Sequence, residues 1–420
     1  MSGHRLVVLL GLVLLATVSS AGPVAAGDPP PLPVAKASSG AVPPTAPPAE
    51  EAVAPRLEAR AWALIDARTG DVLASHAGGK RLPIASTTKM MTAYVAMQEL
   101  PLRRIVRAAP YDAIFGESLL ELRPGQQVSV RDLLYGLILR SGNDAAADLA
   151  LAAAGSEERF VRQMNRRAAA LGLADTHYAN PIGLDEAGNY SSALDLATLG
   201  RRLLDIPAFA RIADARSAEL RSLRSPRRIE TLNDFLLAEP WATGVKTGHT
   251  FGADYVLVGS GERKGVELIS AVLGTWTESA RDLETTRLLE YGFSRYRPRT
   301  PIRRGQELAE ASIRYSGGEL PLRAARTIEI GVRGDQRLMV AVRAPAEVEG
   351  PIRRGASLGR ATVFIDGRRA AVATLRAGRA VPKASAIDRA RSFAGDNAIA
   401  IGLAGFVILM GVVFLRRFSR

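Results

Sequence analysis

No cysteine occurs anywhere in the 420-residue chain. Disulfides, thiol catalysis and cysteine-ligated zinc are therefore excluded, and any fold must be stabilised by its core alone. With 47% hydrophobic residues the chain has enough apolar material for a globular core. Its length suits about two or three domains.

The N-terminal segment has the layout of a secretory signal peptide. Residues 1–26 combine a short polar start, an apolar stretch from Leu6 to Val18 and small residues like those of an A-x-A cleavage site. The segment predicts export, whether it is then cleaved or retained. Residues 27–54 are rich in Pro and Ala, a composition that cannot bury enough surface to fold, and are predicted to form a linker.

The C-terminal end carries an uncharged apolar run over residues 398–415. As a helix this run would be about 27 Å long, near the thickness of a bilayer's hydrocarbon core. A linker over 382–397 precedes it, and a basic tail over 416–420 follows it, which favours a cytoplasmic tail. The sequence thus predicts a single-pass cell-membrane protein, anchored by a C-terminal transmembrane helix, with its body outside the cytoplasm. A buried terminal helix is the alternative, although the run has no polar face.

The segment between these ends reads as an α+β domain followed by a β domain. Strands at both ends of residues 55–296 with helices between them suggest the α+β class. Short alternating segments after Pro301 predict a small, separate all-β domain over 301–381. The expected elements are strands over 61–66, 71–76, 255–259, 267–273, 327–332, 338–343 and 361–365, a helix over 275–291, and helical periodicity starting near Ser86.

The net charge of +13 comes almost entirely from arginine. This bias is more typical of an Arg-rich proteome than of a nucleic-acid surface, and no RNA- or DNA-binding signature accompanies it. We therefore expect no nucleic-acid partner. A solvated basic face is the ordinary interpretation, and attraction to anionic wall polymers or lipid headgroups is the alternative.

The first chemical motif is Ser86-Thr87-Thr88-Lys89. If Ser86 opens a helix, Lys89 lies on the same face and its amine can approach the serine hydroxyl. A neutral Lys89 could then take the serine proton, and burial, a helix N-terminus or a second cation such as Lys246 would favour the neutral form. Alone the motif is equally well a helix N-cap followed by a surface lysine.

Two further motifs follow in the chain. Ser141-Gly142-Asn143 comes after an apolar helical pattern, where a glycine fits a tight C-terminal turn. In Lys246-Thr247-Gly248, glycine permits close approach of a ligand, while threonine and lysine offer a hydroxyl and a charge for a carboxylate. Alone, these would be a helix cap and an exposed edge-strand lysine.

The three motifs together occur in the order found in penicillin-recognising serine enzymes. On these residues the chain resembles the D-alanyl-D-alanine carboxypeptidase family, the low-molecular-mass penicillin-binding proteins. The resemblance is strong over about Pro55 to Arg295 and weaker over 301–381. It includes AWALIDARTG from Ala61, IASTTKMMT from Ile84, LLYGLILRSGNDAAA from Leu133, THYANPIGL from Thr176 and KTGHT from Lys246.

The resemblance implies a fold and a reaction. The fold is a β-lactamase/transpeptidase-like domain, an antiparallel sheet flanked by helices, followed by the small all-β domain. The reaction removes the terminal D-alanine from peptidoglycan stem pentapeptides through an acyl-enzyme on the serine, which β-lactams also acylate. The implied catalytic residues are Ser86, Lys89 and Ser141; Asn143, Lys246, Thr247, Gly248 and His249 would bind substrate, with the N–H groups of Ser86 and His249 forming the oxyanion hole.

Two positions depart from the family pattern. Asn189 stands where relatives commonly have His, and Asp254 stands where a Gly usually follows Ala253. These departures affect loop detail and substrate preference.

Other functions are less well supported. A nucleophile elbow over Gly355–Gly359 lacks a later histidine, because the last histidine of the chain is His249. The scattered histidines show no metal spacing, so no metal and no cofactor is expected. A β-lactamase and a non-catalytic wall-binding scaffold remain the rivals, and the sequence leaves open endopeptidase activity, the role of the β domain and the oligomeric state.

Overall fold

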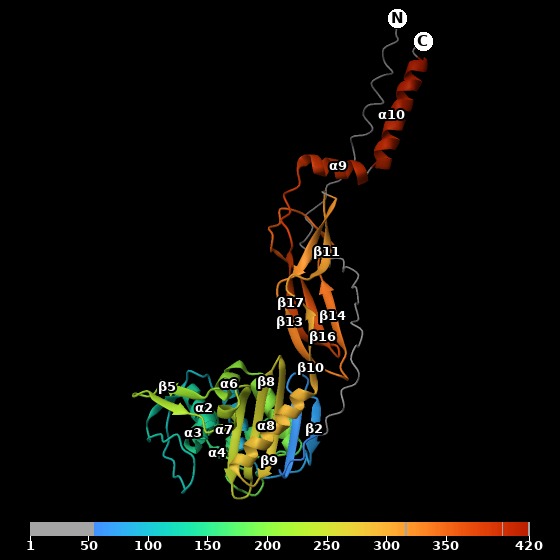
Figure 1. The fold of residues 1–420 in the computed structure, drawn as a ribbon. Coiled ribbons are helices and arrows are strands. Elements are labelled where there is room, and N and C mark those ends of the chain that lie inside the picture. The colour runs from blue at the N-terminus through green and yellow to red at the C-terminus, as the bar shows by residue number, and fades with distance from the viewer. Residues whose placement is uncertain (1–53, 316, 397, 419–420) are drawn as a thin grey trace.

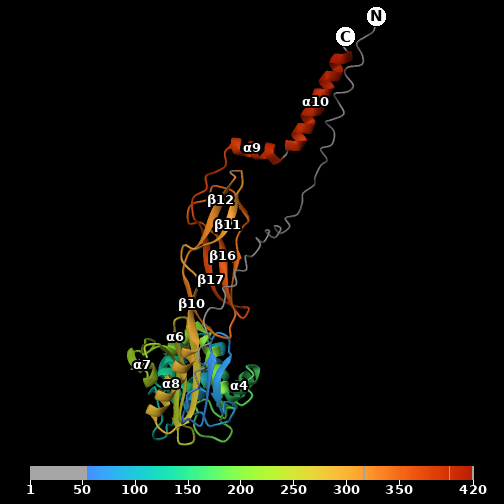
Figure 2. The ribbon, with the colours of Figure 1, turned by 45° about the vertical axis from the view of Figure 1, so that its right-hand side comes forward.

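The computed structural model describes residues 54–315, 317–396 and 398–418. The predicted signal peptide, and the linker up to residue 53, lie outside the described residues. The described chain forms two stacked domains, with two helices beyond the second domain (Figures 1 and 2).

The first domain is built on a five-stranded antiparallel sheet. Its strand order is β2-β1-β9-β8-β7, which leaves β7 at one edge. This confirms the predicted antiparallel sheet. The strands are β1 (Ala61–Asp66), β2 (Val72–His76), β7 (Ala242–Thr250), β8 (Asp254–Arg263) and β9 (Val266–Thr275).

Strand β1 shows why the sheet is covered on both faces. Ala61, Ala63 and Ile65 pack into one hydrophobic cluster, whereas Trp62 and Leu64 pack into another. Side chains of a strand alternate between its two faces, so a strand that is buried along its whole length needs a layer on each side.

Helices provide those layers. Helix α8 packs on β8 and β9 on one face, with the short α7 beside it, and α5 packs on β1 and β9 on the other face (Figure 1). The helices are the 3-10 helix η1 (Ala85–Thr88), α1 (Lys89–Glu99), α2 (Val130–Leu139), α3 (Asn143–Ala154), α4 (Glu157–Ala170), α5 (Ala193–Leu204), α6 (Pro207–Ala213), α7 (Asp234–Ala238) and α8 (Glu278–Ser294). Two small hairpins, β3 (Ile105–Arg107) with β4 (Gln127–Ser129) and β5 (Ser217–Leu220) with β6 (Arg227–Glu230), complete the domain.

The predicted helix over 275–291 begins three residues later than expected. Thr275 still pairs with Tyr255 at the end of β9. The hydroxyl of Thr277 accepts the Ala280 N–H at 3.1 Å and so caps α8. The capping residue therefore decides where the helix begins.

The second domain is all β, as predicted. A six-stranded sheet in the order β14-β16-β17-β12-β11-β15 lies with the two-stranded sheet of β10 and β13 around its own hydrophobic core. Strand β10 follows α8 directly and pairs with β13. The strands are β10 (Tyr296–Ile302), β11 (Glu307–Ile313), β12 (Gly318–Ala324), β13 (Ile328–Arg333), β14 (Leu338–Arg343), β15 (Glu347–Val348), β16 (Ser357–Ile365) and β17 (Arg368–Ala377).

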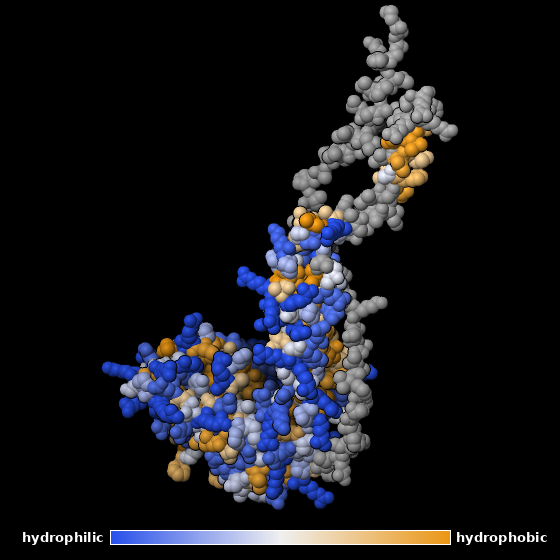
Figure 3. Space-filling model, turned by 45° about the horizontal axis from the view of Figure 1, so that its top comes forward, coloured by the Kyte–Doolittle hydropathy of each residue, from blue (hydrophilic) through white to orange (hydrophobic). Residues whose placement is uncertain are grey.

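Two helices, α9 (Ala386–Asp396) and α10 (Ala398–Phe418), follow the β domain. Helix α10 exposes apolar side chains such as Leu403, Phe406 and Val407, which Figure 3 shows as a hydrophobic patch. It also continues past the apolar run through two arginines. In the described part of the chain, no helix combines the length and apolarity that crossing a membrane requires. The predicted transmembrane helix over 398–415 is therefore not supported.

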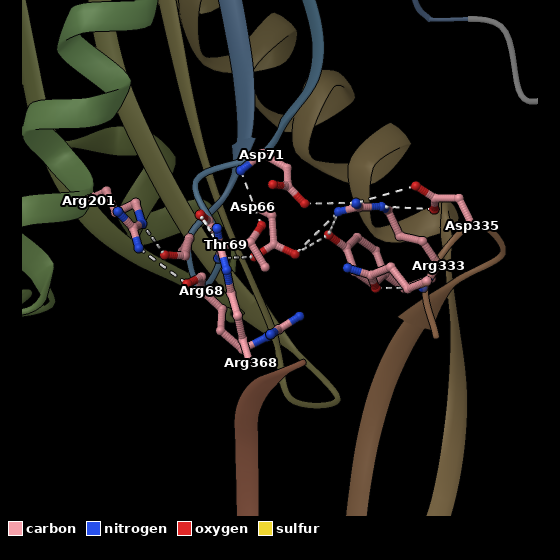
Figure 4. Close-up of polar contacts among 11 residues, drawn as sticks. Asp66, Arg68, Thr69, Asp71, Arg201, Arg333, Asp335 and Arg368 are labelled. Carbon is pink, nitrogen blue, oxygen red and sulfur yellow. Dashed lines mark hydrogen bonds and ion pairs between the residues drawn. The ribbon is translucent and has the colours of Figure 1, made fainter. Parts of the chain in front are cut away.

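A cluster of ionic contacts, which we call the clamp, joins the two domains at the turn between β1 and β2 (Figure 4). Arg333 of the β domain contacts the carboxylates of Asp66 at 3.5 Å and Asp71 at 2.9 Å. The Tyr296 hydroxyl donates to Asp66 at 2.6 Å, and the Arg368 guanidinium donates to the carbonyl of Thr69 at 2.7 Å. Hydrogen bonding to Arg333 lowers the pKa of Asp71.

Removal of Arg333 should weaken the clamp. In Arg333→Ala the Asp66 carboxylate, only 3% exposed, loses its ion pair, and we expect about 3 kcal/mol less free energy of unfolding. Urea denaturation measures this change, with the exposed Arg337→Ala as control. Equal midpoints for the two variants would show that Arg333 does not hold the domains together.

Candidate active site

Ser86 lies on the short 3-10 helix η1, and Lys89 begins α1 directly behind it. Side chains three residues apart eclipse each other in a 3-10 helix, so this geometry brings the two side chains together. Lys89 Nζ lies 2.9 Å from Ser86 Oγ, which confirms the contact expected from the spacing. Ser86 is half-buried and accessible to a substrate.

Lys89 is held in conditions that favour a neutral amine. Its side chain is 0% exposed, and its Nζ donates a hydrogen bond to the carbonyl of Ile182 at 2.6 Å. Burial first, and the charge of Lys246 second, lower the pKa of Lys89 well below its usual range. A neutral amine that donates to Ile182 can direct its lone pair toward the Ser86 hydroxyl, as a general base must.

The loop carrying Ile182 is fixed by Asn180. The Asn180 side-chain oxygen accepts the N–H groups of Ile182 at 3.2 Å and Gly183 at 2.7 Å. Gly183 has a positive φ of 97°, and a Cβ there would lie 2.0 Å from the carbonyl oxygen of Ala85. Only glycine allows the loop to approach the Ser86 turn this closely.

Ser141 lies in the turn between α2 and α3, and Asn143 is the first residue of α3. The expected glycine cap is wrong in one respect: Ser141, with a φ of 56°, adopts the left-handed conformation, whereas Gly142 has a φ of −58° and precedes α3. Helix α2 therefore ends with a serine, not a glycine, in the left-handed position that follows its C-cap residue Arg140. Both Ser141 and Asn143 are buried.

Strand β7 brings the third motif to the same place. A Cβ on Gly248 would lie 3.0 Å from the backbone nitrogen of Ser86, so the edge strand runs beside the nucleophile. Thr247 is half-buried and His249 is exposed, with its ring stacked 4.2 Å from that of Tyr255. An oxyanion hole formed by the N–H groups of Ser86 and His249 remains a prediction.

Read alone, the third motif suggested an exposed lysine on an edge strand. Lys246 is instead buried, with only 2% of its surface exposed. Its Nζ donates to the carbonyl of Thr247 at 2.8 Å. Burial first, and Arg281 second, lower the pKa of Lys246 to about 7.

A family model described as D-alanyl-D-alanine carboxypeptidase matches residues 48–277, more than half of the chain. The chain belongs to the D-alanyl-D-alanine carboxypeptidase family. The matched range includes every site residue named above.

Relatives with known names and solved structures agree with this assignment. The chain is 31% identical to D-alanyl-D-alanine carboxypeptidase DacF of Bacillus subtilis over 81% of this chain and 90% of the relative. It is 40% identical to DacC of Escherichia coli over 62% of this chain and 68% of that protein. The crystal structure of the carboxypeptidase DacD from Francisella tularensis superposes with a TM-score of 0.57, at 26% identity, over 80% of this chain and 96% of that one.

The two departures from the family pattern have different surroundings. Asn189 is buried, and its amide donates to the Thr88 hydroxyl at 3.4 Å, so it packs behind η1. Asp254 has a positive φ of 55° and its carboxylate lies 3.6 Å from the Arg60 guanidinium. An aspartate tolerates this backbone conformation better than most residues with a Cβ.

Sequence reasoning missed Glu117 and Tyr111. Glu117 Oε2 accepts a hydrogen bond from Asn143 Nδ2 at 2.7 Å and another from the Tyr111 hydroxyl. The Glu117–Asn143 contact joins residues 26 positions apart, and no motif among those we recognised includes Glu117. In this chain, the three motifs therefore do not include every residue of the site.

Proposed function

We propose that this protein is a serine-type D-alanyl-D-alanine carboxypeptidase that trims peptidoglycan stem pentapeptides through an acyl-enzyme on Ser86. The observation that carries the proposal is the 2.9 Å contact between Ser86 Oγ and the buried amine of Lys89. The relatives named above carry the same activity in their names.

The first half of the reaction acylates the enzyme. Ser86 Oγ attacks the carbonyl carbon between the two terminal D-alanines while Lys89 takes the hydroxyl proton. The N–H groups of Ser86 and His249 stabilise the oxyanion. Ser141 passes a proton to the departing amine, so the C–N bond breaks and D-alanine leaves.

The same site orients the substrate before attack. Lys246 and Thr247 bind the terminal carboxylate, for which a buried ammonium and a hydroxyl are suited. Gly248 lets the peptide lie close to the edge strand, and Asn143 holds the peptide backbone. Because the pKa of Lys246 is about 7, carboxylate binding should weaken as pH rises above that value.

The second half of the reaction releases the product. Water attacks the ester carbonyl and gives its proton to Lys89, which passes that proton to Ser86 Oγ as the C–O bond breaks and the shortened peptide is released. A β-lactam enters the same path: its ring amide is attacked by Ser86, and the opened ring stays bound as an ester.

We also propose that the catalytic domain works outside the cytoplasm, which the signal-like residues 1–26 support.

The experiment is mass spectrometry of the protein after incubation with benzylpenicillin. We expect the intact mass to increase by one benzylpenicillin, with the adduct on the peptide that contains Ser86, and no adduct on Ser86→Ala. Rapid loss of the adduct with release of opened antibiotic would favour a β-lactamase. A folded protein that forms no adduct and hydrolyses neither penicillin nor a D-Ala-D-Ala peptide would favour the scaffold interpretation.

A further inference from the structure

The loop that precedes β4 is attached to the turn carrying the second motif. The backbone N–H of Asn143 donates to the carbonyl of Ser118 at 2.8 Å. The Asp144 carboxylate accepts the N–H groups of Leu120 at 2.8 Å and Leu122 at 3.0 Å. Glu117 therefore reaches Asn143 from a loop segment that backbone hydrogen bonds hold in place.

Glu117 is ionised in this position. Partial burial acts to raise the pKa of Glu117, but hydrogen bonds from Asn143, Tyr111 and the Ile114 N–H, with the charge of Lys89, outweigh it, so that the pKa is lowered. An ionised carboxylate can only accept hydrogen bonds. The neighbouring Tyr111 stays protonated as a donor, since burial and Glu117 raise its pKa.

The ionised carboxylate decides which way round the Asn143 amide lies. An asparagine amide has one donor end and one acceptor end, and either end can occupy the same space. Facing a carboxylate, only the Nδ2 end forms a hydrogen bond, and the reverse orientation would place two oxygens against each other. One N–H of Nδ2 is then bound to Glu117 at 2.7 Å, and the same amide also interacts with the Tyr111 hydroxyl.

We propose that Glu117 is a positioning residue that fixes the orientation of the Asn143 carboxamide, and with it the donor group that Asn143 presents to a carbonyl of the substrate backbone. This inference rests on the proposed function, because Asn143 is assigned to substrate only through it. Glu117 touches no reacting atom in this scheme and acts through Asn143. A charge-assisted hydrogen bond of this kind is among the stronger ones in proteins.

The substitution Glu117→Gln tests the proposal. Glutamine has nearly the same shape, but its amide can pair with Asn143 in either orientation, so the preference is lost. We expect the second-order rate of acylation by a fluorescent penicillin, and kcat/KM for an acylated D-Ala-D-Ala peptide, to fall by about tenfold. The control is Glu121→Gln, an exposed glutamate of the same loop, which should retain the wild-type rate.

A double-mutant cycle separates positioning from a general effect on the loop. If Glu117 acts through Asn143, Glu117→Gln should cause almost no further loss in an Asn143→Ala background. Fluorescent labelling over hours keeps the slow variants measurable. Additive losses in the cycle, or an unchanged rate for Glu117→Gln with wild-type thermal stability, would overturn the proposal.

The pH profile gives a second readout. The charge of Glu117 raises the pKa of Lys89, as that of Asp144 does, while burial and Lys246 lower it. Without the Glu117 charge the pKa of Lys89 falls further, so the acid limb of acylation should move to lower pH. A wild-type protein that binds no penicillin would refute the proposed function instead, whereas wild-type acylation with an unaffected Glu117→Gln refutes only this inference.

Discussion

Replacing Lys89 by arginine or by methionine should reduce acylation by benzylpenicillin by at least about a thousandfold. Arginine cannot give up its proton in a protein, and methionine has no basic nitrogen, so neither can accept the Ser86 proton. Methionine fills the buried space of Lys89 without a charge, which keeps the fold intact. The rate is measured by stopped-flow or by fluorescent labelling on a gel.

The exposed Lys80→Arg is the matched control, and it should acylate at the wild-type rate. The pH dependence of acylation by the wild-type protein gives a further test, because the direction of its change with pH is fixed. Lys89 must be neutral to act, so acylation is present above its lowered pKa and is lost as pH falls through that value. A Lys89→Met variant that acylates within tenfold of wild type would show that another group takes the serine proton.

Replacing Gly183 by alanine should lower the acylation rate by about a hundredfold. The new Cβ would lie 2.0 Å from the Ala85 carbonyl oxygen and 3.0 Å from the Ser86 nitrogen. Both are backbone atoms, so the Ser86 turn or the Ile182 loop must shift. Either shift moves Lys89 Nζ relative to Ser86 Oγ. The proton transfer requires these two atoms to stay within hydrogen-bond distance, which is 2.9 Å in the structure.

Gly172→Ala separates this steric effect from backbone strain. Gly172 also has a positive φ, of 73°, but a Cβ there meets nothing within 4 Å in the described structure. We expect Gly172→Ala to cost about 1 kcal/mol of stability and leave acylation unchanged. The pair is compared by thermal unfolding and by penicillin labelling at a temperature where both are folded. Equal acylation rates would show that the approach of Gly183 to Ala85 has no catalytic consequence.

The sequence was most informative where chemistry depends on neighbours along the chain. The contact between Ser86 and Lys89 follows from a spacing of three residues, and β1 and β9 follow from short apolar runs of strand length. The separate β domain could likewise be predicted from the short alternating segments that begin after Pro301. All of these are local patterns, whose period determines which side chains share a face.

Contacts between distant segments could not be predicted in this way. The approach of Gly183 to Ala85 and the hydrogen bond from Asn143 to Glu117 depend on loop paths that no periodicity encodes. The left-handed conformation of Ser141 is a similar case, because a glycine beside it suggested that the glycine would adopt it. Surrounding contacts, rather than residue preference, determine the conformation there.

The prediction for the C-terminal segment is not supported by the described helices. The apolar composition and the length of residues 398–415 favoured a transmembrane helix. Among the described residues, however, no helix meets both requirements. A run of apolar residues is compatible with more than one kind of helix.

The position of the clamp also determines how mechanical load enters the catalytic domain. Arg333 and Arg368 contact the turn between β1 and β2 (Figure 4), and this turn lies at the opposite edge of the sheet from β7, which carries Lys246. A force applied to the β domain therefore enters through the α8–β10 connection and through the turn between β1 and β2, and none of these elements carries a catalytic side chain. We expect tension on the β domain to turn the catalytic domain as a unit, because the load does not pass through β7.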